Sequence, residues 1–129
     1  MIDFYLNAKS GVAPYMQLIQ QVRHALRLGV LHEGDRLPTV REVVARLAIN
    51  PNTVSKAYRE LEYEGLVTAR QGRGTFIAKT IDGPAVAAQE PLRQKLEQWL
   101  VEARAAGLDD EGVEALFLST FRAFAEVRA

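Results

Sequence analysis

The sequence of 129 residues contains no cysteine and only two histidines, His24 and His32. The absence of cysteine excludes both a disulfide framework and a metal site built from thiolates. The two histidines stand eight residues apart without a carboxylate motif around them. We therefore expect them to be ordinary, partly exposed side chains, and we expect neither a bound metal nor a cofactor.

Long apolar runs and catalytic constellations are also missing. No apolar run approaches the ~18 residues that a membrane-spanning helix requires. The N-terminus, Met1-Ile2-Asp3-Phe4, lacks the basic region and apolar stretch of a secretion signal, so we expect a soluble, cytoplasmic protein. The sequence shows no paired nucleophile and base, no phosphate-binding loop and no carboxylates clustered beside a histidine, which predicts that the protein is not an enzyme.

The net charge of the whole chain is zero, but its two parts carry net charges of opposite sign. Residues 1–78 contain ten Lys or Arg against seven Asp or Glu, and residues 79–129 contain six against nine. This difference hints at a basic binding module joined to a different kind of element.

Apolar periodicity predicts three helices in the first part of the chain. The first runs over about 15–28, with an apolar stripe of Tyr15, Leu18, Ile19, Val22 and Leu26. The second runs over about 39–47, where Thr39 and Glu42 have the spacing of a reciprocal capping box. The third runs over about 51–64, with Asn50 as N-cap and Pro51 at its first position.

These helices and the segment after them predict a winged helix-turn-helix. About three residues separate the second and third helices, which is typical of a helix-turn-helix. Residues 66–70 and 75–78 flank Gln71-Gly72-Arg73-Gly74, a turn that predicts a β-hairpin. The fold class expected is therefore mainly α with a small β-hairpin. Residues 2–6 fit either a short strand or an arm packed on the body.

The remainder of the chain predicts a linker and two helices. Residues 79–91, with Gly83, two prolines and several alanines, are expected to form the linker. Two amphipathic helices follow within 92–129, the second capped by Asp109. Two such helices cannot enclose their own apolar residues, so either the winged domain or another copy of the chain must cover them.

The third helix carries a surface suited to DNA. If Val54, Ala57, Tyr58 and Leu61 face inward, the outer surface presents short amides, hydroxyls and cations. The N-terminal part of a recognition helix reaches base edges in a major groove with such groups. We expect Tyr58, Tyr63 and the Phe and Trp residues to belong to the core, and the acidic Glu60, Glu62 and Glu64 to limit how far the helix enters the groove.

The run GDRLPTVREVVARLAINPNTVSKAYRELEYEGLVTARQGRGTFIA, residues 34–78, resembles the GntR family of bacterial transcription regulators. The resemblance covers about 75 residues from near Asp3 and implies a sequence-specific DNA-binding regulator, expected to be a homodimeric repressor of a two-fold symmetric operator. The family's DNA contacts, carried over to matching positions, fall on Arg41, Asn50, Asn52, Thr53, Ser55, Lys56, Gln71, Gly72 and Arg73. Several members have Arg where Pro51 and Ser55 stand here, so the base sequence read is not transferred.

The short C-terminal part is similar to the YtrA-like subfamily, in which two helices serve dimerisation. The resemblance thus implies a DNA-binding domain over 1–78, a linker over 79–91 and a dimerisation element over 92–129. The dimer surface expected comprises Leu96, Trp99, Leu100, Leu116, Phe117, Phe121 and Phe124.

Two other readings stay open at this point. A regulator fused to a pyridoxal-phosphate aminotransferase-like domain has a similar N-terminal module, but that domain is missing unless the chain is a fragment. The tail helices could instead dock a different protein, with DNA binding secondary. Whether a small-molecule effector exists is also left open by the sequence.

Overall fold

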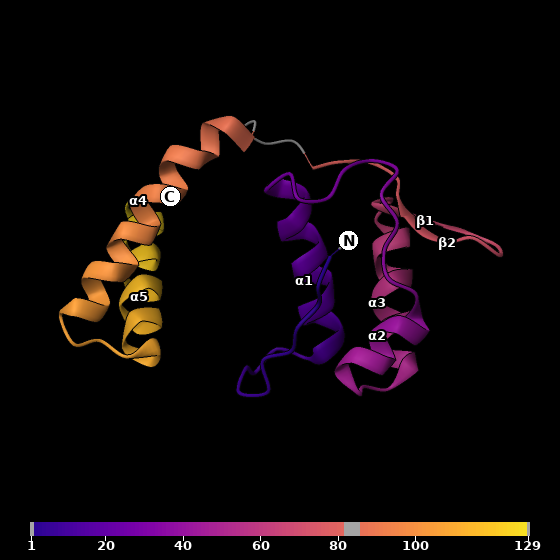
Figure 1. The fold of residues 1–129 in the computed structure, drawn as a ribbon, viewed down its shortest axis with the longest axis horizontal. Coiled ribbons are helices and arrows are strands. Elements are labelled where there is room, and N and C mark those ends of the chain that lie inside the picture. Colours follow the sequence, from indigo (N-terminus) through magenta and orange to yellow (C-terminus); the bar gives the residue numbers. More distant parts are fainter. Residues whose placement is uncertain (1, 82–85, 129) are drawn as a thin grey trace. The chain divides into compact units, whose positions relative to one another are not determined.

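The computed structural model describes residues 2–81 and 86–128. The chain divides into two compact units, Met1–Val86 and Ala87–Ala129, which are described separately below (Figure 1). Within the described residues no helix is long and apolar enough to cross a membrane.

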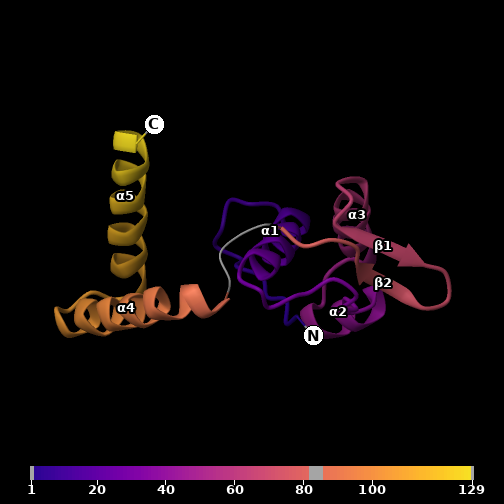
Figure 2. The ribbon, with the colours of Figure 1, turned by 90° about the horizontal axis from the view of Figure 1, so that it is seen from above.

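The first unit consists of three helices followed by an antiparallel hairpin, which confirms the winged helix-turn-helix expected from the sequence (Figure 2). Its elements are α1 (Pro14–Arg27), α2 (Val40–Leu47), α3 (Pro51–Tyr63), β1 (Val67–Arg70) and β2 (Gly74–Ile77). Each helix lies within a residue or so of its expected boundaries.

Local capping explains where α2 and α3 begin. The Thr39 hydroxyl accepts a hydrogen bond from the Glu42 amide at 3.1 Å, and the Glu42 carboxylate accepts from the Thr39 amide at 3.2 Å. The predicted capping box is therefore present. At α3, the Asn50 Oδ1 atom accepts from the Asn52 amide at 2.8 Å, and Pro51 occupies the first helical position.

The turn between α2 and α3 contains an unusual backbone conformation. Ala48 ends α2 in the left-handed region with φ 54°, and its N–H donates to the Val44 carbonyl at 2.8 Å. This conformation is strained for a residue with a β-carbon, since it brings that atom close to the following carbonyl oxygen. It reverses the chain quickly enough for Asn50 to cap α3 two residues later.

The core of the first unit is formed by the inward stripes of the helices. The largest side chains that are fully enclosed come from α1, α3 and the segment before α2: Leu18, Leu37, Leu61, Val22 and Val54. Ala57 and Tyr58 are also buried, as predicted for the inner face of α3. Burial of these apolar surfaces is the main force that holds α3 against α1.

Residues 2–6 form an arm and not a strand. Gln21 of α1 holds Tyr5 through both main-chain groups, its Nε2 donating to the carbonyl at 2.8 Å and its Oε1 accepting from the amide at 3.1 Å. Gln17, which is buried, binds the Asn7 amide at 2.8 Å and carbonyl at 3.2 Å in the same way. The arm thus finds hydrogen-bond partners in glutamine side chains, and Phe4 enters the core.

The wing is a short hairpin reinforced by the segment that precedes α2. Val67 pairs with Ile77 and Arg70 pairs with Gly74 across the hairpin. On the other side of β2, the Leu37 amide donates to the Thr75 carbonyl and the Ile77 amide to the Asp35 carbonyl, both at 2.8 Å. These bonds tie the base of the wing to the start of the helix-turn-helix.

The second unit is a pair of helices, α4 (Val86–Ala105) and α5 (Asp110–Arg128). The Asp109 carboxylate accepts from the Gly112 amide at 2.8 Å, which confirms its expected role as a cap. Gly107 makes the turn between the helices with φ 97°.

The start of α4 differs from the expectation, because residues 86–91 of the predicted linker are helical. Ala87, Ala88, Gln89 and Glu90 favour a helix, and Pro91 is tolerated one turn into it at the loss of one main-chain hydrogen bond. Residues 82–85, also in the predicted linker, lie outside the described residues.

Candidate nucleic-acid interface

The N-terminal part of α3 presents the polar surface that the sequence predicted. Asn52 and Lys56 are exposed, and Thr53 and Ser55 are half-buried between them and the core. Asn50 is exposed too, but its Oδ1 is engaged in capping α3, which leaves its NH₂ group as a donor. The amides at this helix start also favour an anionic partner.

One stripe runs along the whole outer face of α3. It contains Asn52, Lys56, Arg59 and Tyr63, which are spaced at i, i+4, i+7 and i+11 and are all exposed. Tyr63 is 93% exposed, so the expectation that it belongs to the core was wrong. It stands at the last position of the helix, opposite the buried Leu61 side, where no described element of the first unit covers it.

Lys56 is held by an aromatic ring. Its Nζ atom lies 3.9 Å from the centroid of the Tyr15 ring, which belongs to the first turn of α1. Tyr15 is half-buried and packs against the core, so the ring is supported from behind. This geometry is that of a cation–π interaction.

The acidic residues at the C-terminal end of α3 have structural partners. The Glu64 carboxylate pairs with the Arg23 guanidinium of α1 at 2.6 Å. The Glu62 carboxylate accepts from the Ala69 amide in β1 at 2.8 Å. These bonds join the C-terminal end of α3 to α1 and to the wing. The two carboxylates therefore stabilise the fold, a role that their position in the sequence did not indicate.

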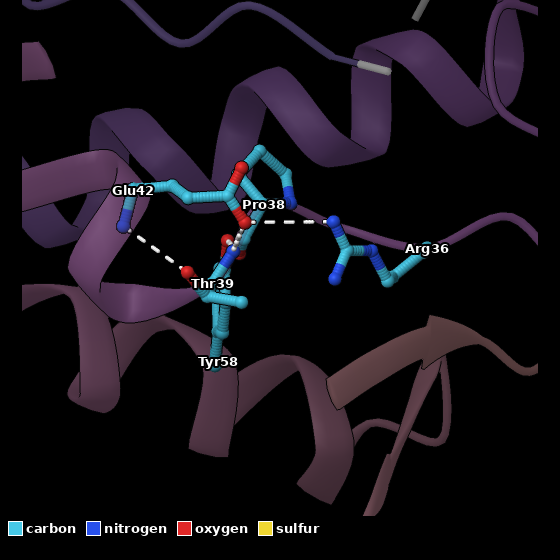
Figure 3. A network of polar contacts seen from close by, with 5 residues as sticks. All are labelled: Arg36, Pro38, Thr39, Glu42 and Tyr58. Carbon is cyan, nitrogen blue, oxygen red and sulfur yellow. Dashed lines mark hydrogen bonds and ion pairs between the residues drawn. The ribbon is translucent and has the colours of Figure 1, made fainter. Parts of the chain in front are cut away.

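A polar network joins the start of α2, and the segment before it, to Tyr58 of α3 (Figure 3). The buried Tyr58 hydroxyl donates to the Pro38 carbonyl at 2.5 Å, and the Arg36 guanidinium lies 3.5 Å from the Glu42 carboxylate. Hydrogen bonds from Thr39 lower the pKa of Glu42, with a smaller contribution from Arg36. Burial, and secondarily the Glu42 charge, raises the pKa of Tyr58, so its hydroxyl stays protonated as a donor. Arg41 lies between Thr39 and Glu42 in the sequence and is exposed.

The wing presents its own polar groups. Gln71, Gly72 and Arg73 are exposed in the loop between β1 and β2, which projects away from α2 and α3 (Figure 1). Gly72 has φ 75°, a conformation that suits glycine, and the Arg73 amide closes the turn on the Arg70 carbonyl at 2.9 Å. Arg70 itself lies over the Phe76 ring, with its guanidinium carbon 4.8 Å from the ring centroid.

The predicted site residues therefore fall into two groups on one compact unit. Arg41 and the Asn50–Lys56 segment belong to the helix-turn-helix, and Gln71, Gly72 and Arg73 belong to the wing. Sequence reasoning missed the contacts of Tyr15 and Arg36. The stripe that includes Tyr15 was visible in the sequence, but its pairing with Lys56 depends on how α1 packs on α3.

The described residues contain no group of three or more His, Cys, Asp or Glu side chains placed to hold a metal ion. The arrangement has no pairing of a nucleophile with a base among the residues discussed above. Its chemistry is that of donors and cations displayed on a helix and a wing, which suits recognition of bases and phosphates.

Comparison with known proteins agrees with this geometry. Residues 14–77 match the family described as "Bacterial regulatory proteins, gntR family". The chain is 37% identical over 107 residues to the HTH-type transcriptional repressor YtrA of Bacillus subtilis (strain 168), covering 82% of each protein.

Solved structures support the same assignment. YtrA from Sulfolobus acidocaldarius, a GntR-family transcription factor, is 25% identical with a TM-score of 0.54, covering 98% of this chain and 100% of that one. The DNA-binding domain of AraR in complex with operator ORX1 is 25% identical with a TM-score of 0.51, covering 58% of this chain and 93% of that one. The chain therefore belongs to the gntR family of bacterial regulatory proteins and is a DNA-binding transcription regulator, not an enzyme.

Proposed function

We propose that this regulator is a homodimeric repressor that binds a two-fold symmetric operator through α3 and the wing. The observation that carries the proposal is the division of α3 into two faces. Val54, Ala57 and Leu61 are buried, whereas the opposite stripe displays an amide and two cations to solvent. A helix fixed to its domain in this way can insert its outer face into a major groove without rearranging.

The proposed DNA contacts divide by chemistry. Asn52 reads a base pair, since its amide can pair with adenine through two hydrogen bonds. Lys56 and Arg41 bind phosphates, Thr53 and Ser55 donate to phosphate or to a base edge, and Asn50 donates its NH₂ group. In the wing, Arg73 enters a minor groove, where the small neighbours Gly72 and Gly74 allow the backbone to approach, and Gln71 adds a polar contact.

The proposed dimer surface lies on the second unit. Among residues 87–127 only Ala103 is buried, while the aromatic side chains of α4 and α5 form a cluster in which Trp99 is half-buried and Phe117 and Phe121 are exposed. Trp99 lies 6.3 Å from Phe117, and Phe117 stacks on Phe121 at 6.1 Å, measured between ring centroids. Leu96, Leu100, Leu116 and Phe124 extend this surface and are all exposed in the single chain.

A second copy of the chain is the partner that we propose for this surface. A two-fold axis makes one apolar patch complementary to itself, and it also places two recognition helices on successive half-sites. In this proposal residues 1–78 bind DNA, residues 92–129 dimerise and residues 79–91, of which 86–91 are the start of α4, connect them. Repression is proposed because the YtrA relative of Bacillus subtilis is named a repressor.

The experiment that tests the proposal is selection of bound duplexes from random DNA, followed by affinity measurements on the selected duplex and on a scrambled duplex at two salt concentrations. We expect an inverted repeat and a specificity ratio of at least ~10³. Sedimentation of the protein with and without the duplex gives the stoichiometry, for which we expect two chains per inverted repeat.

Two outcomes would contradict parts of the proposal. If one chain bound a single half-site, the proposed dimer would be wrong, but the proposed role of α3 in reading DNA would stand. Weak, salt-sensitive binding without a consensus, together with a monomeric chain, would favour a tail that docks a different protein.

A further inference from the structure

We propose that Tyr15 is a positioning residue for DNA binding, because its ring holds the Lys56 ammonium group at the face of α3 that meets DNA. The inference rests on the proposed role of Lys56 as a phosphate contact. It adds a residue from α1, outside the helix-turn-helix and the wing, to the groups that determine affinity.

The first step of the argument is the placement of the two side chains. Tyr15 lies one helical turn before Leu18 and Ile19, which are buried in the core of the first unit, where α1 packs on α3. Lys56 directly precedes the buried Ala57 on α3. The packing of the two helices therefore brings ring and ammonium group together, with 3.9 Å between Nζ and the ring centroid.

The second step concerns the stiffness of this support. The Tyr15 ring is half-buried against the core and has two side-chain torsions, so packing fixes its orientation. A free lysine side chain has four torsions and loses much rotamer freedom when a phosphate immobilises it. A lysine that already lies on a ring loses less freedom on binding, which increases affinity.

The third step concerns what remains available for DNA. A cation–π contact uses the electrostatic field of the ring and leaves the lysine charged. The ammonium group carries three N–H donors, and those that point away from the ring can bind phosphate oxygens. Lys56 is exposed, so a phosphate can approach it from the side of the solvent.

The experiment is a double-mutant cycle on Tyr15 and Lys56. The probe is a fluorescein-labelled duplex of mixed sequence, since a phosphate contact contributes to binding of any sequence. Anisotropy titrations over a series of salt concentrations would be made with Tyr15→Leu, Lys56→Met, the double variant and the wild type. Tyr15→Phe keeps the ring face, and Tyr5→Leu removes a tyrosine from the exposed arm as a matched control.

We expect Tyr15→Leu to weaken binding about two- to five-fold, the effect of losing an exposed cation–π contact. Tyr15→Phe and Tyr5→Leu should bind within about two-fold of the wild type. Lys56→Met should lower the slope of log affinity against log salt by about 0.9. In the Lys56→Met background, Tyr15→Leu should have no further effect.

Several results would overturn the inference. Equal weakening by Tyr15→Leu in both backgrounds would assign Tyr15 to helix packing only, and the role of Lys56 would stand. Tighter binding by Tyr15→Leu would mean that the ring keeps Lys56 away from DNA. If Lys56→Met bound DNA as tightly as the wild type, both the inference and the proposed phosphate contact of Lys56 would be wrong. Thermal melts of each variant would show whether it is folded, and Lys56→Met alters an exposed side chain only.

Discussion

The two units of this chain differ in the solvent exposure of their large apolar side chains. In the first unit Leu18, Leu37 and Leu61 are fully enclosed by three helices and a hairpin. In the second, Leu100 and Phe121 remain exposed on a pair of helices that has too few elements to surround them. The first unit therefore has a hydrophobic core of its own, whereas the second has the exposed apolar surface for which we proposed a dimer.

The largest expected effect comes from placing a charge on that surface. Phe121→Asp would bury an unpaired carboxylate in the proposed dimer, which costs about 3–5 kcal/mol and raises the dissociation constant at least ~100-fold. Ala115→Asp, on the opposite face of α5, is the matched control. Sedimentation equilibrium measures both variants, and equal dimerisation by the two would refute the assignment of this face.

A truncation in the first unit tests whether its core is the source of stability. Leu61→Ala removes a side chain with 0% exposure and is expected to lower the free energy of unfolding by about 2–5 kcal/mol. Leu118→Ala, at an exposed position on α5, should change it by less than ~0.5 kcal/mol. Chemical denaturation compares the two, and similar losses would mean that the two units do not differ as described.

On the DNA-binding face, one variant separates reading of bases from binding of phosphates. Asn52→Ala is expected to lose about 1–3 kcal/mol on the selected duplex and to relax preference at one base pair. Lys56→Ala should weaken binding to selected and scrambled duplexes alike. Competition titrations against single-base variants of the duplex make the comparison, and equal losses for Asn52→Ala on all duplexes would remove its role as a reader.

The smallest effect is a pH dependence located in the first unit. Hydrogen bonds from Thr39 hold the pKa of Glu42 below its ordinary value of 4.5, so the ionised carboxylate stabilises the folded state. This contribution is fully present above the ordinary pKa and is lost as the pH falls through the lowered one. In thermal melts from neutral to acidic pH, the melting temperature should therefore decline less steeply for Glu42→Gln than for the wild type. Parallel declines would argue against a stabilising role of the ionised Glu42.

Local chemistry explains why the helix-turn-helix could be predicted from its sequence. Thr39 and Glu42 specify the start of α2 within three residues, and Asn50 with Pro51 does the same for α3. The inward stripe of α3 follows from helical spacing alone. None of these features requires knowledge of a distant residue.

Features that depend on distant residues were not predictable in the same way. The arm could not be told from a strand, because its main-chain partners are Gln17 and Gln21 on a helix. The ring beneath Lys56 belongs to a helix that is remote in sequence, and Tyr63 looked apolar enough for a core that does not extend to it. The start of α4 was placed too late because the glycine, prolines and alanines of residues 79–91 indicated a linker, although the helix accommodates Pro91.

The left-handed alanine between α2 and α3 has a consequence for how this regulator can evolve. A β-carbon at φ 54° costs on the order of 1 kcal/mol, and a glycine at position 48 would remove that cost without altering the reading surface. One substitution thus separates the present turn from a more stable one. The stability gained by Ala48→Gly would offset destabilising substitutions in the recognition helix that alter which operator it binds.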